Sequence, residues 1–527
     1  MLWLLKDFDL LSVLLRAATL SFEALTLGGT AFLLLVALPA QLSDSAQLTL
    51  RRAVRIAALA FAVAQISSIA VSSAILIGGS GFSFHDVLAT NFFRADLLAA
   101  FAAVLLCVLL GHARLSAFAA AAVLAASVAT SHAAARLDHR PLLLGLTAAH
   151  HTGTAIWIGA MPFLLLALRS SPSRAASVMV RRYSMMAMAG AALLLGAGLW
   201  MAWFYVRSWQ GLYGTTYGAM LLAKGYLFLL MIGLGAGNFL LLRRTKYQPD
   251  SLLVRLRRFS EAEIGLGFTA ILVAASLTSQ PPAVDLTQDR LTTHDIVQRM
   301  HWETPRLKSP PLAQLAPPTS MAVAVRDSQF TDGSISDAND RAWSEYNHHW
   351  AGLIVLAAGL MALLAQLGGR RWAGNWPLLF IGLAIFILLR ADPENWPLGP
   401  RSFWQSFAQP DVLEHRLYAV LITVFAFFEW GVETGRIHTR RAAYVFPLLC
   451  AAGGALLITH SHALSNIKDE MLTELSHTPI ALLGATAGWA RWLELRLPSR
   501  RESKMAGIVW PLCLVLVGLV LLDYREM

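Results

Sequence analysis

The chain has 527 residues, of which 56% are hydrophobic and 14% are charged. An average soluble protein carries about a quarter charged residues, so this composition excludes an ordinary soluble protein and indicates a chain that lies in lipid. The formal net charge is +10, but the basic residues do not gather in one patch or tail, which argues against nucleic acid as a partner.

Hydrophobic runs of roughly 18–25 residues recur from one end of the chain to the other. Each run is long enough, as an α-helix, to cross the roughly 30 Å of hydrocarbon in a bilayer. We therefore predict an all-α, polytopic integral membrane helical bundle with about fourteen transmembrane helices. The predicted spans are 10–38, 53–77, 92–111, 115–131, 141–168, 181–206, 218–242, 258–279, 349–368, 374–390, 412–432, 441–460, 475–495 and 507–523.

The first run follows Lys6, Asp7 and Asp9 and shows no convincing cleavage site, so we predict a first transmembrane helix rather than a removed signal peptide. Basic residues then gather in every second connection, beginning with Arg51 and Arg52. Under the positive-inside rule these connections are cytoplasmic. We expect both termini to be periplasmic, with the protein in the lipid of a bacterial inner membrane.

Charged residues also occur inside the apolar runs of the first half. Arg16 and Glu23 lie seven positions apart on one face of the first predicted helix, and Lys224 lies in the seventh. Such groups usually face a bundle interior or a cavity. Glu23 is too short to reach water and is a buried partner or a proton site, whereas Lys224 could extend outward to the interface.

Histidines in the first half are candidate metal ligands. Imidazole suits copper and zinc, and His132, His150 and His151 all fall near the outer side of the predicted membrane. Adjacent His150 and His151 diverge by about 100° on a helix, so only one can face a given site. We predict that His132 and one of these two share an outer cavity. The same residues could instead hold b-type haem between facing helices.

Methionines form a second group of candidate metal ligands, at the cytoplasmic end of the first half. Met185, Met186 and Met188 cluster on the sixth predicted helix, and Met161 lies at a similar depth on the fifth. Thioethers bind Cu(I), so these residues could form an inner relay. Methionine is also an ordinary filler of gaps between helices, and both readings stay open.

A proline-rich polar stretch divides the chain. We predict an eight-helix membrane domain at 1–282, a periplasmic proline-rich linker loop at 283–347 and a six-helix membrane domain at 348–527. The three cysteines, Cys107, Cys450 and Cys513, lie in apolar runs and give neither a disulfide framework nor a CxxC metal motif.

Histidines gather again in the second domain. We predict that His460, His462 and His477 form the core of a second outward-facing metal site. Thr478-Pro479 resembles an N-cap followed by the first helical position, which would place His477 at a helix mouth. Further candidate ligands are His348, His349 and His415, although polar aromatic residues also favour the membrane interface for reasons unrelated to metal.

Several local patterns carry a resemblance to a known family. They are Ala148-Ala149-His150-His151, Trp157-Ile158-Gly159, Arg182-Tyr183-Ser184, Tyr217 through Lys224, Asn238, and Thr278 through Pro282. Over roughly 10–282 the chain resembles the copper resistance protein D (CopD/PcoD) family, with a C-terminal six-helix extension similar to that of longer members. The resemblance implies an inner-membrane protein that accepts copper from the periplasm, often beside a separate periplasmic copper chaperone.

Four functions remain open on the sequence. The first is a copper permease for homeostasis or resistance, which is not an enzyme; no P-loop or other ATP-using motif is present. The second is an electron-transfer protein with b-type haem, and the third is a copper-dependent membrane oxidoreductase that uses the second histidine group. The fourth is a structural or assembly role without metal.

Overall fold

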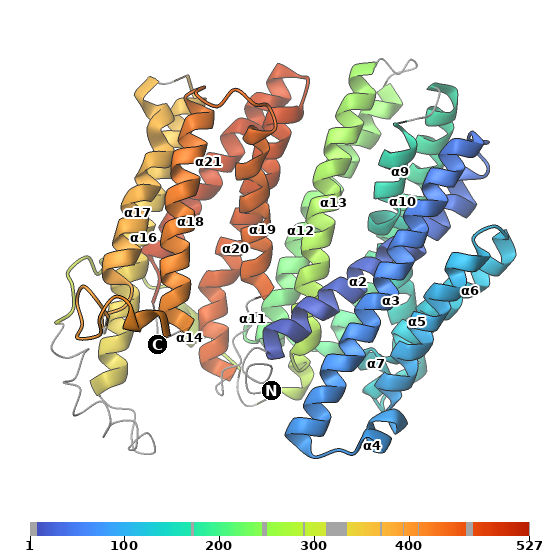
Figure 1. Cartoon of the computed structure of the whole chain (residues 1–527), viewed down its shortest axis with the longest axis horizontal. Helices are drawn as coiled ribbons and strands as arrows, with labels where there is room; N and C mark the ends of the chain where they lie inside the picture. Colours follow the sequence, from blue (N-terminus) through green and yellow to red (C-terminus); the bar gives the residue numbers. More distant parts are fainter. Residues whose placement is uncertain are drawn as a thin grey trace. The chain divides into compact units, whose positions relative to one another are not determined.

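The structure is a computed structural model that describes residues 8–169, 173–244, 250–287, 290–311, 335–368, 371–393, 395–408, 410–459 and 467–525. Helices dominate these ranges, and no strand occurs in them (Figure 1). Within the same ranges ten helices are long and apolar enough to cross a membrane by length and composition. The predicted all-α, multi-pass membrane bundle is confirmed at this level.

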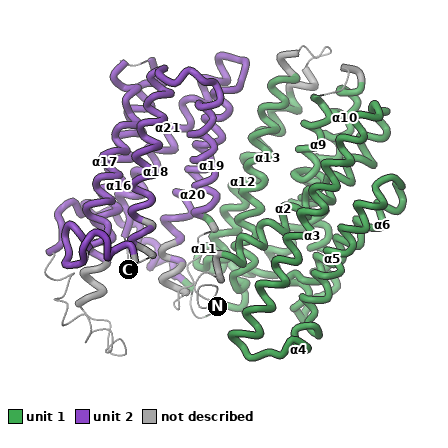
Figure 2. Tube along the Cα trace, viewed as in Figure 1, with its two compact units in different colours: residues 1–290, 458–465 green, residues 291–457, 466–527 purple. Residues whose placement is uncertain are grey.

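Two compact units divide the chain, and Figure 2 colours them separately. Unit 1 comprises Met1–Arg290 with Ile458–Ser465, and unit 2 comprises Leu291–Leu457 with Asn466–Met527. The main division after Arg290 falls inside the segment predicted as a linker.

Unit 1 is built from long helices joined by short turns. Its helices are α2 (Phe8–Phe32), η1 (Leu33–Ala37), α3 (Asp44–Ser80), α4 (Phe84–Ala89), α5 (Asn91–Leu109), α6 (Ala113–Ala129), α7 (His132–Ala135), α8 (Arg140–Thr154), η2 (Ala155–Gly159), α9 (Met161–Ala167), α10 (Ser173–Tyr205), α11 (Trp209–Tyr213), α12 (Thr216–Arg244), α13 (Asp250–Ser279) and η3 (Ala283–Asp285).

Helix α2 is the centre of unit 1. It packs against α3, α13, α6, α8 and η2, and it is the most enclosed of the ten candidate spans. Small residues make this possible, since Gly28 and Gly159 let the backbones of α2 and η2 approach within a distance that a side chain would block. Small residues at helix contacts are the usual solution where lipid supplies no hydrophobic drive for helix association.

The turn between α3 and α5 shows how local sequence sets helix ends. Helix α3 ends where Gly81 adopts a left-handed φ of 70°. Ser83 then caps α4 in a capping box with Asp86, whose carboxylate accepts from the Ser83 hydroxyl and backbone N–H. These two hydrogen bonds, the hydroxyl first, hold the pKa of the Asp86 carboxyl below its ordinary value.

Unit 2 is a second helical bundle. Its helices are α14 (Thr293–Arg299), α16 (Ile335–Gln366), η5 (Arg371–Leu378), α17 (Leu379–Arg390), η6 (Gln405–Ala408), α18 (Pro410–Glu433), η7 (Ala442–Tyr444), α19 (Val445–Thr459), α20 (Ile467–Arg496) and α21 (Arg500–Leu522). Helix α21 packs along α16 and α20, and α17 packs on α18. An aromatic cluster that includes Trp376, Phe446 and Trp510 fills the bundle.

Helices or consecutive helical segments lie at all of the predicted spans, but some differ from the expectation. The span 141–168 is interrupted by the π-helical η2. Helix α20 is continuous over Ile467–Arg496 with Pro479 inside it, so the prediction of a helix start at Thr478-Pro479 is wrong. A proline inside a membrane helix is tolerated because neighbouring groups can satisfy the carbonyl that it leaves unpaired. The hydroxyl of Thr478 donates to Glu474 one turn earlier instead of capping.

Candidate functional site

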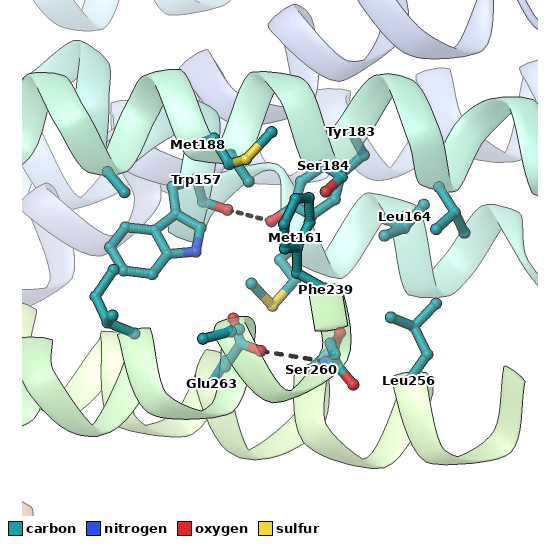
Figure 3. A pocket seen from close by; sticks show the side chains of 17 residues that line it. Trp157, Met161, Leu164, Tyr183, Ser184, Met188, Phe239, Leu256, Ser260 and Glu263 are labelled. Carbon is teal, nitrogen blue, oxygen red and sulfur yellow. Dashed lines mark hydrogen bonds between the residues drawn. The ribbon is translucent and has the colours of Figure 1, made fainter. Parts of the chain in front are cut away.

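A cavity of about 290 Å³ lies within unit 1, between α10, α12, α13 and the segment η2–α9. We call it the methionine cavity because the thioethers of Met161 and Met188 are both on its wall (Figure 3). Apolar side chains and a few polar groups make up the rest of the wall, among them Trp157, Tyr183, Asn238, Ser260 and Glu263. The structure thus brings together two of the four methionines proposed as a relay.

The other two methionines of that predicted relay have different environments. Met186 is buried but is not on the wall of the cavity, and Met185 is 51% exposed on the outside of α10. Met186 therefore points away from the other two, whereas Met185 and Met188, three positions apart, lie on the same side of α10 and are 51% and 49% exposed.

Polar groups of the methionine cavity are held in fixed positions. The hydroxyl of Tyr183 donates to the backbone carbonyl of Trp157 at 2.7 Å. The carboxyl of Glu263, only 4% exposed, accepts a long hydrogen bond of 3.5 Å from Asn238 and has a polar contact with the indole of Trp157. Two thioether groups and one buried carboxyl group consequently line the same cavity.

Trp157 lies in the π-helical segment η2, next to a proline. Pro162 lacks the N–H that would bond the carbonyl of Ile158 in an α-helix, so the regular hydrogen-bond ladder cannot continue through this turn. The chain passes through the π segment Ala155–Gly159, a kind of distortion that often occurs at functional sites. The hydroxyl of Tyr183 donates to the carbonyl of Trp157 within this segment.

Glu23 and His151 form a buried pair close to η2. Nδ1 of His151 on α8 lies 2.8 Å from Oε1 of Glu23 on α2, and the two side chains are 15% and 5% exposed. Because a carboxylate accepts, this contact places a proton on Nδ1 and leaves Nε2 of a neutral ring with a lone pair. Histidine oriented by a carboxylate in this manner is common at metal sites.

His150 faces a different helix from its neighbour, as the one-residue spacing predicts. Its ring lies over Gly198 of α10, and its Nδ1 is buried without a hydrogen-bond partner among the described residues. Lys224 of α12 is close enough to interact electrostatically with the ring. His150 is therefore a second imidazole of unit 1 with an unsatisfied nitrogen.

His132 lies at the end of a different helix pair. Its Nε2 donates to the carbonyl of Thr278 at 2.8 Å and so joins α7 to the end of α13. None of His132, His150 and His151 lines the methionine cavity. The predicted sharing of one outer cavity by these histidines remains a prediction.

Three of the second-domain histidines gather around Tyr524 in unit 2. The ring of His348 stacks on Tyr524 with centroids 3.7 Å apart, and that of His477 meets the same ring edge-on at 6.1 Å. His349 bonds the backbone carbonyl of Tyr524 through Nε2 at 2.8 Å. Helices α16 and α20 and the end of α21 thus bring together residues that lie far apart in sequence.

Hydrogen bonds decide which of these rings has a free lone pair. His349 uses both nitrogens, because Nδ1 accepts from the Arg306 N–H at 2.7 Å while Nε2 donates to Tyr524. His349 cannot bind a metal ion in this arrangement. His348 donates from Nδ1 to the Ser344 carbonyl at 2.8 Å, which leaves its Nε2 as the nitrogen that could act as a ligand.

The remaining predicted ligands lie elsewhere. Nδ1 of His415 is 2.9 Å from Oδ1 of Asp392. His460 and His462 lie outside the described residues. Among the residues that the structure describes, no group of three or more His, Cys, Asp or Glu side chains is arranged to hold a metal ion.

Several polar partners in the membrane helices were not singled out from the sequence. Glu263 of the methionine cavity is one of them. Asp96 is another; it is 8% exposed and interacts electrostatically with Arg16. The signal was present, because each is an acidic residue within an apolar run and such residues usually face a bundle interior.

The ten long apolar helices of the described residues, with ionisable groups buried among them, define a multi-pass membrane protein. Residues 177–277 match the family model described as copper resistance protein D. All residues that line the methionine cavity, apart from Trp157, Met161 and Leu164, lie within the matched segment.

A curated relative gives a second comparison. The chain is 33% identical to the copper transport protein CutJ of Bacillus subtilis (strain 168) over 163 residues. The aligned region is 30% of this chain and 29% of that protein, so the two are matched over less than a third of their lengths. No solved structure matched the chain.

Proposed function

We propose that this protein accepts copper at the periplasmic face of a bacterial inner membrane and moves it inward through unit 1. One observation carries the proposal: most of the wall of the methionine cavity belongs to the segment that matches the copper resistance protein D family. The copper transport protein CutJ, similar over part of its length, supports the same cargo.

The chemistry of unit 1 supports a path with two kinds of ligand. His151, oriented by Glu23, offers Nε2, and imidazole binds copper in either oxidation state. Met161 and Met188 offer thioethers, which are soft ligands that favour Cu(I). A cation without such ligands would meet a prohibitive loss of hydration in the hydrocarbon, so protein groups at successive depths make the crossing possible.

The orientation of the chain is part of this proposal. We place both termini and the segment 283–347 on the periplasmic side, with about fourteen crossings, because basic residues gather in alternate connections. A separate periplasmic copper chaperone would then deliver the ion to the side where His132 lies. No catalytic reaction is proposed for the chain.

An export-dependent reporter fused at Gly333 tests the orientation. We expect activity only when the reporter is exported, since the fusion point lies in the segment assigned to the periplasm. A second fusion at Arg500, in a connection assigned to the cytoplasm, should give the opposite result. Activity of the Gly333 fusion in the cytoplasm would require a different number of crossings.

The double substitution Met161→Leu with Met188→Leu tests the proposed path. Leucine conserves volume but has no sulfur, so the fold should survive while copper uptake into vesicles falls about tenfold or more, the factor that about 1.4 kcal/mol of lost binding produces. Uptake would be measured by metal analysis, with copper supplied as Cu(I) and as Cu(II) in separate reactions.

Met185→Leu is the matched control, because this side chain is on the same helix and about as exposed as Met188, 51% against 49%, but is not on the cavity wall. It should leave uptake unchanged. Equal uptake by the double variant and the control would remove the methionine cavity from the path. A strong Soret band from the purified protein would instead favour the electron-transfer reading with b-type haem.

A further inference from the structure

Unit 2 contains a buried group of charged side chains that the proposed copper path does not use. Glu433 on α18 and Glu494 on α20 both pair with Arg491, the first at very short range and the second at 2.7 Å. The indole N–H of Trp510 on α21 donates to Glu494 at 2.8 Å. Three helices of the bundle are thus joined through one guanidinium group.

Glu429, one helical turn before Glu433, is the exceptional member of this group. Its side chain is 1% exposed, and neither carboxyl oxygen has a hydrogen-bond partner among the residues that the structure describes. Residues four apart on a helix face the same side, so Glu429 and Glu433 point toward the same part of the bundle. Glu429 is therefore an unpartnered acidic side chain directed at a charged cluster.

Burial first, and the neighbouring charges second, decide the protonation state of this carboxyl group. With Glu433 and Glu494 ionised, the single positive charge of Arg491 is already exceeded, and an ionised Glu429 would add a third negative charge. An ionised carboxylate without hydrogen bonds in a medium of low dielectric is so unfavourable that the group takes up a proton instead. The other titratable neighbours are the thiols of Cys450 and, beyond it, Cys513, which are neutral and cannot stabilise an anion as a cation would.

The depth of the carboxyl groups suggests how a proton reaches Glu429. The side chains of Glu433 and Glu494 are 17% and 14% exposed, whereas Glu429 is almost fully enclosed. Glu433 is the last residue of α18, next to the connection that contains Arg436. The carboxyl group at the end of α18 is thus more exposed than the one a helical turn before it.

We propose that Glu429 is a proton-binding site of unit 2, which exchanges its proton through Glu433 with water at the end of the bundle where Arg436 lies. In the exchange, the O–H bond of Glu429 breaks and an O–H bond forms on Glu433, directly or through one water molecule. Glu433 then releases that proton to solvent and takes up another, which passes back to Glu429 by the same route, and Arg491 stays charged throughout. This inference does not depend on the proposed copper path.

Infrared spectroscopy of the full-length protein in lipid vesicles, without copper, tests the proposal. At neutral pH we expect a carbonyl band of a protonated carboxylic acid that is lost in Glu429→Gln. The matched control is Glu345→Gln, since Glu345 of the same unit has a cation partner, Arg306, at 3.2 Å. This control should leave the band unchanged, as should the addition of copper to the wild-type protein.

Two further variants test the proton-binding site and the exchange route independently. Glu429→Asp retains an acid at this position, so it should keep a protonated-acid band at a shifted frequency even if Glu429→Gln does not fold. In heavy water the wild-type band should shift as the proton exchanges, and Glu433→Gln should slow that shift. An unchanged band in Glu429→Gln would overturn the site, and an unchanged exchange rate in Glu433→Gln would overturn the route.

Discussion

Arg491→Met should lower the free energy of unfolding by about 3–5 kcal/mol, the usual loss when one partner of a buried ion pair is removed. Arg491 is the cation between Glu433 and Glu494, its side chain is only 8% exposed, and its guanidinium also lies 5.1 Å from the ring of Trp510. Methionine retains much of the length of the side chain, so the loss should come mainly from two carboxylates left without a cation. Denaturation in detergent, followed by circular dichroism, measures the effect.

Two further variants test this explanation. Arg500→Met changes the same residue type at an exposed position, and its effect should be within about 0.5 kcal/mol of zero. Adding Glu433→Gln and Glu494→Gln to Arg491→Met should recover part of the stability, because the uncompensated charges are then gone. An Arg491→Met protein as stable as the wild type would mean that water reaches and screens the cluster.

Hydrophobicity and length were sufficient to predict where the helices lie. The bilayer sets both quantities, so a run such as 53–77 identifies α3 whatever its neighbours are. The end points were less accurate where polar residues continue a helix beyond the hydrocarbon. Helix α20 begins at Ile467, ahead of the predicted 475, because Lys468, Asp469 and Glu470 are compatible with a helix outside lipid.

The partners of individual side chains were harder to predict, because hydropathy does not state which helices are neighbours. Glu23 was recognised as a buried partner or proton site, but its contact with His151 depends on the close approach of α2 to η2 and α8. In the same way, the tautomer of His349 is set by its hydrogen bonds with the backbone of Arg306 and Tyr524. The spacing of the histidines in the sequence does not reveal these bonds.

The two halves also differ in how far short sequence motifs predict their sites. The histidine pair at 150–151 and the glycine at 159 belong to short patterns that the resemblance to a copper family already marked. The charged cluster of unit 2 comes from residues on three helices with no common motif. Only the packed bundle brings Glu429, Arg491 and Trp510 together.

Gly159→Ala should destabilise unit 1 by about 1–3 kcal/mol or more, the range for a side chain forced into a filled space. A Cβ atom at this position would lie 1.9 Å from the backbone carbonyl oxygen of Ala24 and 2.4 Å from its carbon. Backbone atoms cannot rotate away as a flexible side chain could, so α2 and η2 must separate. The thermal midpoint of the protein in detergent measures the loss.

Gly145→Ala is the matched control for this prediction. Gly145 is also helical, in α8, but a Cβ atom there would meet no atom within 4 Å. Alanine should stabilise that helix by about 0.5–1 kcal/mol, since glycine loses more conformational freedom in a helix. Separation of α2 from η2 would also displace Glu23 from His151, so copper uptake by Gly159→Ala should fall together with stability. Equal stability of the two variants would show that α2 and η2 are not packed backbone to backbone.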